Sequence, residues 1–202
     1  MGSPKRRQRR PFKPMRIAAI DFETANNYSD AAICAAGLAI FEDWKLTETL
    51  YWLIRPPRGC GWFWDNFIEI HGITHKDVLH EPEFPAIAHQ LLPRLATAEI
   101  VIAHWASFDV RKLQGTLEHF QLPCPKFEYL CTCQLAKRVW PGLPSHGLEA
   151  LAEHIGHSFQ HHHARADAET AGYVLLAMMK DMGVTTPREL AKSLDIPPRA
   201  FP

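Results

Sequence analysis

Two acidic side chains separated by one residue, Asp21 and Glu23, are the first groups in the chain that could take part in chemistry. They end an apolar segment, 16–21, that is predicted to form a β-strand. Because side chains alternate along a strand, both carboxylates are expected on one face, about 6 to 7 Å apart, with Ile20 and Phe22 on the other. Such a pair could bind a cation, although the same pattern is common at solvated strand ends.

Two further acidic positions lie at predicted helix starts. Asp109 follows a predicted buried strand and falls in the first turn of a helix predicted for 107–120. Asp167 lies in the first turn of a helix predicted for 164–179, five positions after His162. The helix dipole favours a carboxylate at either place, so each residue taken singly could be structural.

The elements that must position these residues follow from the apolar pattern. Three strands joined by short connections predict an antiparallel meander, and the later part of the chain alternates between helices and single strands. This order indicates one mixed-sheet α/β domain. The predicted strands are 16–21, 32–41, 46–54, 99–103 and 127–130. The predicted helices are 84–96, 107–120, 132–139, 147–155 and 164–179.

Length and charge limit the class of protein. The chain has 202 residues, of which 47% are hydrophobic, enough for one domain with a sizeable core. Its 22 basic and 22 acidic side chains cancel, which excludes a uniformly basic coat protein and a disordered polyelectrolyte. Six of the basic residues lie in 1–14, which contains no acid, so 16 basic residues face 22 acidic ones in the rest, a net charge of −6. The sequence therefore predicts a mobile cationic arm before an acidic body.

No segment is typical of a membrane or secreted protein. The longest apolar stretch, 31–41, has eleven residues, whereas a membrane-spanning helix needs roughly 20. No apolar signal segment follows the N-terminal arginines. Five cysteines form no regular framework, and an odd number fits a reducing compartment. We therefore expect a cytoplasmic protein with free thiols and no membrane partner.

Taken together, the acidic positions match a known set of motifs. These are Asp21-Phe22-Glu23-Thr24, Ala103-His104-x-Ala-Ser-Phe-Asp109 and His162-x-Ala-x-x-Asp167-Ala168, with His71-Gly72-Ile73-Thr74 as a fourth segment. In this order they resemble the DEDD exonucleases of the DnaQ-like family, in the DEDDh subgroup with a catalytic histidine. The resemblance covers about residues 15–180. It implies an RNase H-like α/β fold, with a mixed five-stranded sheet flanked by helices. The exonuclease domain is then expected at 15–182, between a basic flexible arm, 1–14, and a short C-terminal extension, 183–202.

The resemblance also implies the reaction, which is 3′ to 5′ hydrolysis of nucleic-acid phosphodiester bonds with release of 5′-mononucleotides. Several carboxylates brought close together repel one another unless they bind protons or cations, and hard oxygen ligands favour Mg²⁺ or Mn²⁺. By resemblance, two such ions are expected, with Asp21 bridging both, Glu23 and Asp167 on the water-side ion, and Asp109 supporting the second. His162 would accept the proton of the attacking water, a task that suits an imidazole near neutral pH.

Six residues around these motifs are candidates for substrate binding. Thr24, His71 and Ile73 align with the family's pocket for the terminal nucleotide, although His71 could equally cap a helix and Ile73 could equally lie in the core. Relatives commonly have asparagine where this chain has Trp105, whose indole could stack on a base or close the pocket. The aromatic residues Phe22 and Phe108 could form walls of the same pocket.

Other features have two interpretations each. Cys124, Cys131 and Cys133 with the histidines of 154–163 could bind structural zinc, but the spacing matches no familiar zinc module and buried thiols are favoured. The aromatic run 62–64 could bind a ligand, but anchoring of its loop in the core is favoured. The arm 1–14 could contact phosphates or be a solvated tail.

The substrate and partners also have alternatives. We expect a single-stranded or 3′-ended nucleic acid, with DNA favoured over RNA. The alternatives are an RNA-trimming exoribonuclease of the ribonuclease T or oligoribonuclease type, and a nucleic-acid-binding module without catalysis. A polymerase or another replication or repair protein is a further expected partner, although 22 residues after Lys180 leave little room for a long docking tail.

Overall fold

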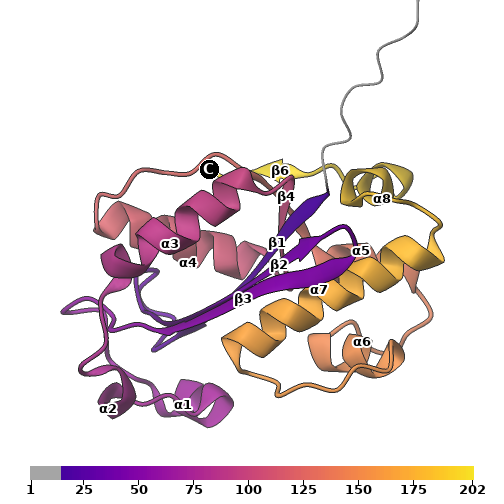
Figure 1. The fold of residues 1–202 in the computed structure, drawn as a ribbon. Helices are drawn as coiled ribbons and strands as arrows, with labels where there is room; N and C mark the ends of the chain where they lie inside the picture. The colour runs from indigo at the N-terminus through magenta and orange to yellow at the C-terminus, as the bar shows by residue number, and fades with distance from the viewer. Residues whose placement is uncertain (1–14) are drawn as a thin grey trace, which may run out of the picture.

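A computed structural model describes residues 15–202. The predicted arm, 1–14, lies outside the described residues, so its interpretation stays a prediction. The chain forms one mixed sheet with helices on both sides (Figure 1). The strands are β1 (Arg16–Thr24), β2 (Ile33–Glu42), β3 (Lys45–Leu53), β4 (Ile100–Ala103), β5 (Glu128–Cys131) and β6 (Arg199–Ala200).

Eight helices complete the described part of the chain. They are α1 (Asp65–His71), α2 (His75–Val78), α3 (Phe84–Thr97), α4 (Ser107–His119), α5 (Thr132–Val139), α6 (Leu148–His154), α7 (Ala164–Asp181) and α8 (Pro187–Ser193). The five predicted helices and five predicted strands are confirmed, and no end differs by more than three residues. The short helices α1, α2 and α8 and the two-residue strand β6 were not predicted, because they are too short to show a clear apolar period. None of the described helices is long and apolar enough to cross a membrane.

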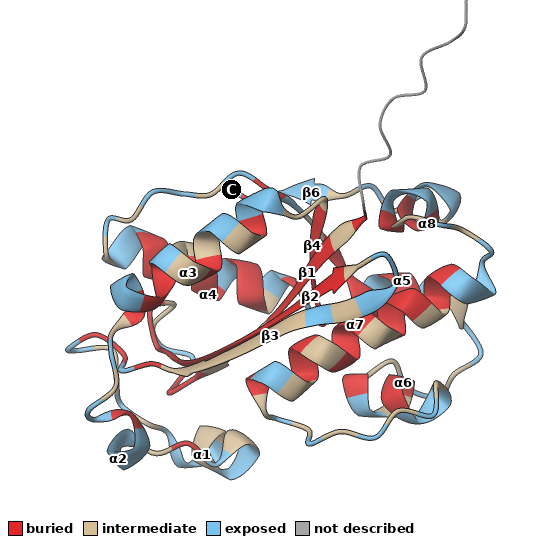
Figure 2. Cartoon of the chain, in the orientation of Figure 1, coloured by how far each residue is buried: buried red, intermediate tan, exposed pale blue. Residues whose placement is uncertain are grey.

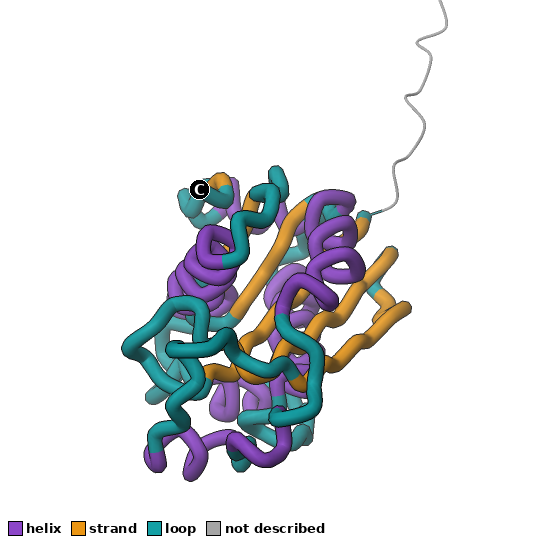
Figure 3. Tube along the Cα trace, turned by 90° about the vertical axis from the view of Figure 1, so that its left-hand side faces the viewer, coloured by secondary structure: helices purple, strands orange, loops and turns teal. Residues whose placement is uncertain are grey.

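The sheet has six strands in the order β3-β2-β1-β4-β5-β6. The expected five-stranded sheet is therefore corrected by one short edge strand, β6, which pairs antiparallel with β5. The first three strands form the predicted antiparallel meander, and β1, β4 and β5 run parallel. In the rotated view of Figure 3 the β2–β3 hairpin lies at the outer margin of the sheet.

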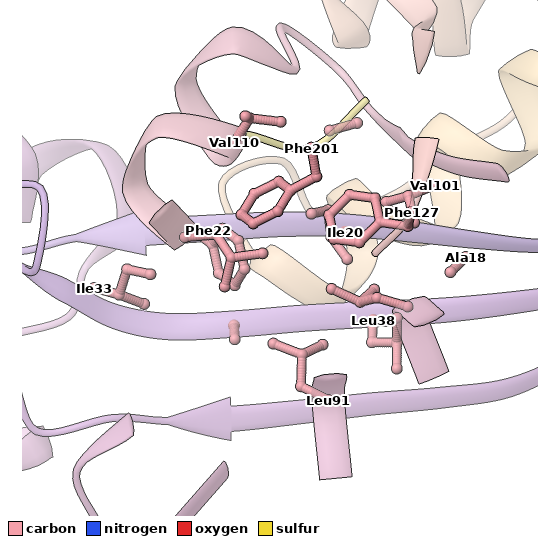
Figure 4. Close-up of a cluster of buried hydrophobic side chains, with 14 of the residues drawn as sticks. Ala18, Ile20, Phe22, Ile33, Leu38, Leu91, Val101, Val110, Phe127 and Phe201 are labelled. Atoms are coloured by element: carbon pink, nitrogen blue, oxygen red, sulfur yellow. The ribbon is translucent and has the colours of Figure 1, made fainter. Parts of the chain in front are cut away.

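The core has a layer on each side of the sheet. One layer packs α3 and α4 against inward-facing residues of β1, β2 and β4, and Figure 4 shows Ile20, Phe22 and Leu38 in this cluster. The other layer packs α5, α6, α7 and α8 on the opposite face. The buried stripe predicted for the last long helix faces this second layer, as the red segments of α7 in Figure 2 illustrate. The two layers hold β1 rigidly between them.

Residues 183–202, expected to be a short extension, pack against the rest of the domain. Leu190 and Ala191 of α8 are fully buried in the second layer. Phe201 is buried in the first layer and stacks on Phe127, with ring centroids 4.6 Å apart. The end of the chain thus closes the β5 side of the sheet.

Candidate active site

Strand β1 carries Asp21 and Glu23 on one face, as its alternation predicts. Ile20 and Phe22 are buried on the opposite side, whereas Asp21 and Glu23 are partly exposed. The residues that precede them on their own face, Ile17 and Ala19, pack in the layer that contains α7. The two carboxylates therefore continue the face of the sheet that α7 covers.

Gly37 allows α7 to approach these carboxylates. It lies on β2 directly opposite Asp21. A Cβ atom at this position would be 2.0 Å from the backbone oxygen of Ala164, so any larger residue would collide with the first turn of α7. The close approach brings Asp167, in that first turn, within ligand distance of Asp21 and Glu23, since one carboxylate oxygen of each lies within 4.8 Å of the others. Gly37 was not identified from the sequence, although a glycine inside an apolar strand is the pattern that marks close backbone approach.

Asp109 reaches the same site from the parallel strand β4. Ala19 pairs with Ile102, so the chain that leaves β4 enters α4 beside the carboxyl end of β1. Asp109 is 1% exposed, and its Oδ1 accepts a hydrogen bond from the backbone N–H of Phe22 at 3.1 Å. The structure thus brings together all four predicted carboxylates. The hydrogen bond attaches Asp109 to the backbone of Phe22, which lies between Asp21 and Glu23 on β1.

The four carboxylates disfavour each other's charge. Burial raises the pKa of Glu23 to about 8, and the neighbouring Asp167 adds to that effect. Burial also raises the pKa of Asp21 well above its usual range, with further contributions from Asp109, Glu23 and Asp167. The pKa values of Asp109 and Asp167 are raised by burial as well. No lysine or arginine lies within 4 Å of any of the four among the salt bridges of residues 15–202.

The donor set fits hard divalent cations. Three carboxylates from two elements converge within ligand distance, and a fourth borders the same cleft. A site that takes its positive charge from metal ions is expected to have carboxylates with raised pKa values. It is also expected to have no lysine or arginine paired with them, as is found for these four within residues 15–202. Oxygen-only ligands favour Mg²⁺ or Mn²⁺ over softer metals.

Three consecutive histidines precede α7, and the structure separates their environments. His162 is exposed, has a left-handed backbone (φ 62°) and stacks on His161, with ring centroids 3.8 Å apart. His161 Nδ1 lies 3.1 Å from Asp167 Oδ1. His163 turns away and stacks on Tyr51 of β3 at 4.4 Å. His161 and His162 thus both border the carboxylates, whereas the sequence motif had indicated His162 alone.

His104, which the sequence motif included without assigning it a role, also borders the site. Its Nδ1 lies 2.9 Å from the hydroxyl of Thr132, and this hydroxyl in turn donates to the carbonyl oxygen of Ala103. Burial lowers the pKa of His104 to about 4, so the ring is neutral near pH 7. Its Nε2 is buried and has no hydrogen-bond partner in the structure.

These groups line a cleft of about 430 Å³. Three of the residues predicted to bind substrate, Phe22, Trp105 and Phe108, form part of its walls, and Trp105 is 53% exposed. The charged groups and histidines in the wall are Asp21, Glu23, Asp109, Asp167, His104, His161 and His162.

Three of the predicted substrate-binding side chains have structural contacts. The Phe22 ring packs in the core (Figure 4), although Phe22 also lines the cleft, so its contact with substrate stays a prediction. Ile73 is buried in a small cluster with Cys34 and Val78, which supports its core alternative. His71 uses both ring nitrogens, because Nε2 is 3.1 Å from the carbonyl oxygen of Thr24 and Nδ1 accepts from the N–H of Ile73.

Thr24 lies at the end of β1, where a register shift follows Glu23. Its side chain is 1% exposed and its hydroxyl has no partner in the structure. Its backbone oxygen contacts His71, as described above. Thr24 therefore adjoins Glu23 at the end of the strand that carries the two carboxylates, and its contact with substrate stays a prediction.

The structure also distinguishes between the two interpretations of the cysteines and of the aromatic run 62–64. Within residues 15–202 the groups of metal-ligating atoms contain no cysteine, and Cys131 and Cys133 are buried thiols, as favoured. The favoured core role of the aromatic run is wrong for Trp62 and Trp64, which are 61% and 42% exposed. Only Phe63 packs against buried residues there.

Comparisons with known proteins agree with this geometry. A family model described as Exonuclease (RNase_T) matches residues 63–175, more than half of the chain. The solved structure of exonuclease X in complex with 5′ overhanging duplex DNA is 28% identical, with a TM-score of 0.66 over 90% of this chain and 98% of that one. E. coli exonuclease I in complex with a dA16 oligonucleotide shares the fold at 15% identity, with a TM-score of 0.71 over 88% of this chain and 42% of that one.

Curated relatives are much longer proteins. The 3′-5′ exonuclease DinG of Bacillus subtilis is 30% identical over 172 residues, which are 83% of this chain and 18% of DinG. The PolC-type DNA polymerase III of Streptococcus thermophilus is 30% identical over 115 residues, 56% of this chain and 8% of that protein. The chain therefore spans less than a fifth of the length of these relatives.

Proposed function

This chain belongs to the RNase T/DnaQ-like DEDDh family of 3′-5′ exonucleases, and from that premise we propose that it removes 5′-mononucleotides stepwise from the 3′ end of DNA. One observation carries the proposal. Four carboxylates from β1, α4 and α7 meet beside two histidines, and none of them pairs with a lysine or arginine of the described chain. A purely structural site would not gather buried like charges in this way.

Asp21, Glu23 and Asp167 would hold divalent cations, and Asp109 would support them from the α4 side. We propose two Mg²⁺ or Mn²⁺ ions per site, with Asp21 shared between them. Bound cations would supply the positive charge that acidifies the attacking water and stabilises the leaving 3′ oxygen. They would also reverse the local field, which explains how an acidic cleft accepts a phosphate.

His162 would accept the proton of the attacking water. Burial and the neighbouring His161 lower the pKa of His162 below its usual value, so its ring is neutral and able to accept a proton at neutral pH. Its exposed position at the mouth of the cleft allows it to pass that proton to solvent. His161, through its contact with Asp167, would orient that carboxylate.

DNA is the substrate that we favour over RNA. Exonuclease X, which is 28% identical to this chain, is described in complex with 5′ overhanging duplex DNA. The aromatic residues Trp105 and Phe108 line the cleft, and aromatic stacking does not depend on base identity. The RNA alternative is therefore a defined outcome of the test below.

The test is a product analysis with 5′-labelled single strands of DNA and of RNA with the same sequence. We expect a ladder that shortens from the 3′ end, 5′-mononucleotides as the small product, and faster loss of DNA. EDTA should stop the reaction, and a circular single strand should stay intact. Cleavage of the circle, or 5′-to-3′ shortening, would contradict the proposal; faster loss of RNA would assign the RNA-trimming alternative.

A further inference from the structure

A second surface leads away from the active-site cleft. Trp105 lines both this cleft and a neighbouring cavity of about 180 Å³, which adjoins a third cavity of about 400 Å³. The two neighbouring cavities share Gln134, Lys137 and Arg199 in their walls. We name this continuous surface the basic groove, and its defining residues are Trp105, Gln134, Lys137, Arg138, Ile196 and Arg199.

The charge of the basic groove differs from that of the cleft. Lys137, Arg138 and Arg199 are exposed, and none has a carboxylate within 4 Å among the described residues. Asp195 is the one acidic residue that lines either cavity. By contrast, Arg94 is paired with Glu48 elsewhere on the surface. An unpaired row of cations on an otherwise acidic body indicates a polyanionic ligand.

Trp105 stands where the cleft meets the basic groove. Its backbone is left-handed (φ 60°), a conformation that a bulky side chain rarely adopts, and its ring is half exposed rather than buried in the core. Lys137 Nζ lies 5.1 Å from the centre of the indole. A surface for stacking a base and a cation for binding a phosphate are therefore adjacent.

We propose that the basic groove binds the part of the nucleic-acid strand that lies on the 5′ side of the nucleotide being removed. One base stacks on Trp105, and the following phosphates contact Lys137, Arg138 and Arg199. The groove would bind any sequence, because the contacts are to phosphates and to the π-face of a base. This inference rests on the proposed function, since the strand must have its 3′ end in the cleft.

A charge-matched pair of double variants tests the groove. Lys137→Gln with Arg199→Gln removes two groove cations, and Lys45→Gln with Lys180→Gln removes two exposed cations of β3 and the end of α7, away from the groove. One substrate is a 12-nucleotide single strand of DNA. The other is thymidine 5′-(p-nitrophenyl) phosphate, which is too small to extend from the cleft into the basic groove. Binding of the same strand in EDTA, followed by fluorescence anisotropy, is measured in parallel.

The groove variant should raise the KM for the 12-mer about tenfold while the small ester is hydrolysed at the native rate. The slope of log affinity against log salt should fall by about 1.4, because each lost phosphate contact on a single strand contributes about 0.7. The control variant should leave the KM and the salt slope close to native. Equal effects of the two double variants, or an unchanged KM in both, would contradict the proposal that the basic groove binds the strand.

Trp105 is tested separately because its replacement also changes backbone strain. Trp105→Phe keeps an aromatic ring, and Trp105→Asn removes it while suiting the left-handed backbone. We expect Trp105→Asn to lose about 5- to 150-fold in kcat/KM for the 12-mer, Trp105→Phe to keep most of it, and neither to melt at a lower temperature. A loss shared equally with the small ester would place Trp105 in the chemistry and overturn its stacking role.

The failure of this inference can be told from the failure of the proposed function. If the native protein hydrolyses neither the small ester nor the 12-mer in Mg²⁺ or Mn²⁺, the exonuclease is excluded. If it hydrolyses both but the groove variant binds the strand with native affinity in EDTA and with native KM, the groove alone is excluded.

Discussion

The two ends of strand β1 differ in whether their charged side chains form ion pairs. At the N-terminal end, Arg16 pairs with Glu42 of β2, and Glu48 of the outer strand β3 pairs with Arg94 of α3 at 2.6 Å. At the C-terminal end, Asp21 and Glu23 meet Asp109 and Asp167, and no lysine or arginine of residues 15–202 pairs with any of the four. The same strand therefore has one end whose charged side chains are paired with opposite charges. At its other end, which we call the uncompensated end, the carboxylates have no such partner.

This difference separates residues that maintain the fold from residues that have a function. Exposed ion pairs contribute little free energy, but they leave nothing for a ligand to complete. The uncompensated end holds its carboxylates with raised pKa values, so the protein gives up stability there until protons or cations bind. A site that lowers stability in this way is where a ligand is expected.

The largest effect should come from neutralising the uncompensated end. Asp21→Asn or Asp167→Asn should lower kcat by about 10³-fold or more, since a bound cation stabilises the transition state by several kcal/mol. Both variants should unfold at or above the native temperature in EDTA, because a repelling charge is removed. The measurement is single-turnover release of mononucleotide together with thermal unfolding. Native rates in these folded variants would refute the role of the carboxylates.

The histidines rank next. His162→Ala should lose about 10² to 10⁴ in rate, the usual cost of removing a positioned base. His163→Ala is the matched control and should keep the native rate, because its ring stacks on Tyr51 outside the cleft. His161→Ala should fall between them through its contact with Asp167. A selective loss at His163 would mean that the histidine motif has been placed one residue out of frame.

The pH dependence of the rate sharpens the same point. Since the pKa of His162 is lowered, the rising limb of log rate against pH should lie below the usual imidazole pKa of about 6.5, after correction for cation occupancy. His162→Ala should flatten this limb. A limb that stays in place in His162→Ala would assign it to another group.

A smaller effect is expected at Gly37, which allows the first turn of α7 to approach β2. Gly37→Ala should move the start of α7 away from β2, because its Cβ would collide with backbone atoms that cannot rotate away. We expect a loss of about 1–3 kcal/mol in stability and about 10²-fold in rate, the usual costs of overpacking and of a displacement near 1 Å. Ala36→Gly, on the other face of the same strand, is a control that should keep activity. An active, equally stable Gly37→Ala protein would contradict the described packing.

Without cations, stability should depend on pH through the same carboxylates. The folded pKa of Glu23 is about 8 and its unfolded value is near 4.5, so the native state binds the proton more tightly and stability falls as pH rises from about 4.5 to 8. Glu23→Gln should remove as much as about 5 kcal/mol of this fall. Denaturant unfolding in EDTA at several pH values measures it. Parallel curves for the two proteins would show that Glu23 is not perturbed.

The smallest effect belongs to the paired end. Arg94→Gln breaks the ion pair with Glu48 and should cost no more than about 1 kcal/mol, because both partners are near the surface. Its rate should be native at every pH. A rate loss here would remove the distinction between the two ends of β1.

The sequence predicted those features that depend on short local patterns. Alternation in β1 placed Asp21 and Glu23 on one face, and the apolar stripe of α7 placed Asp167 at the start of a buried helix. Long, strongly periodic segments and ordered motifs therefore carried both the fold class and the four carboxylates.

Other features depend on contacts between distant segments, which no local pattern contains. Gly37 matters because Ala164 lies above it, and His161 joins the site because the chain turns at His162 with a left-handed backbone. Ile73 and His71 face neighbours that only the folded chain provides. The edge strand β6 is two residues long and exists because β5 offers a free edge.

Mononucleotide release as a function of Mn²⁺ concentration, at fixed pH and in the native protein and Asp21→Asn, tests most directly whether the uncompensated carboxylates are the catalytic centre. Native activity should be absent in EDTA and should rise to a plateau as Mn²⁺ is added, while Asp21→Asn should stay inactive across the same range although folded. Activity that persists in EDTA, or an Asp21→Asn titration that overlays the native one, would contradict the assignment of this cleft as a cation-dependent exonuclease site.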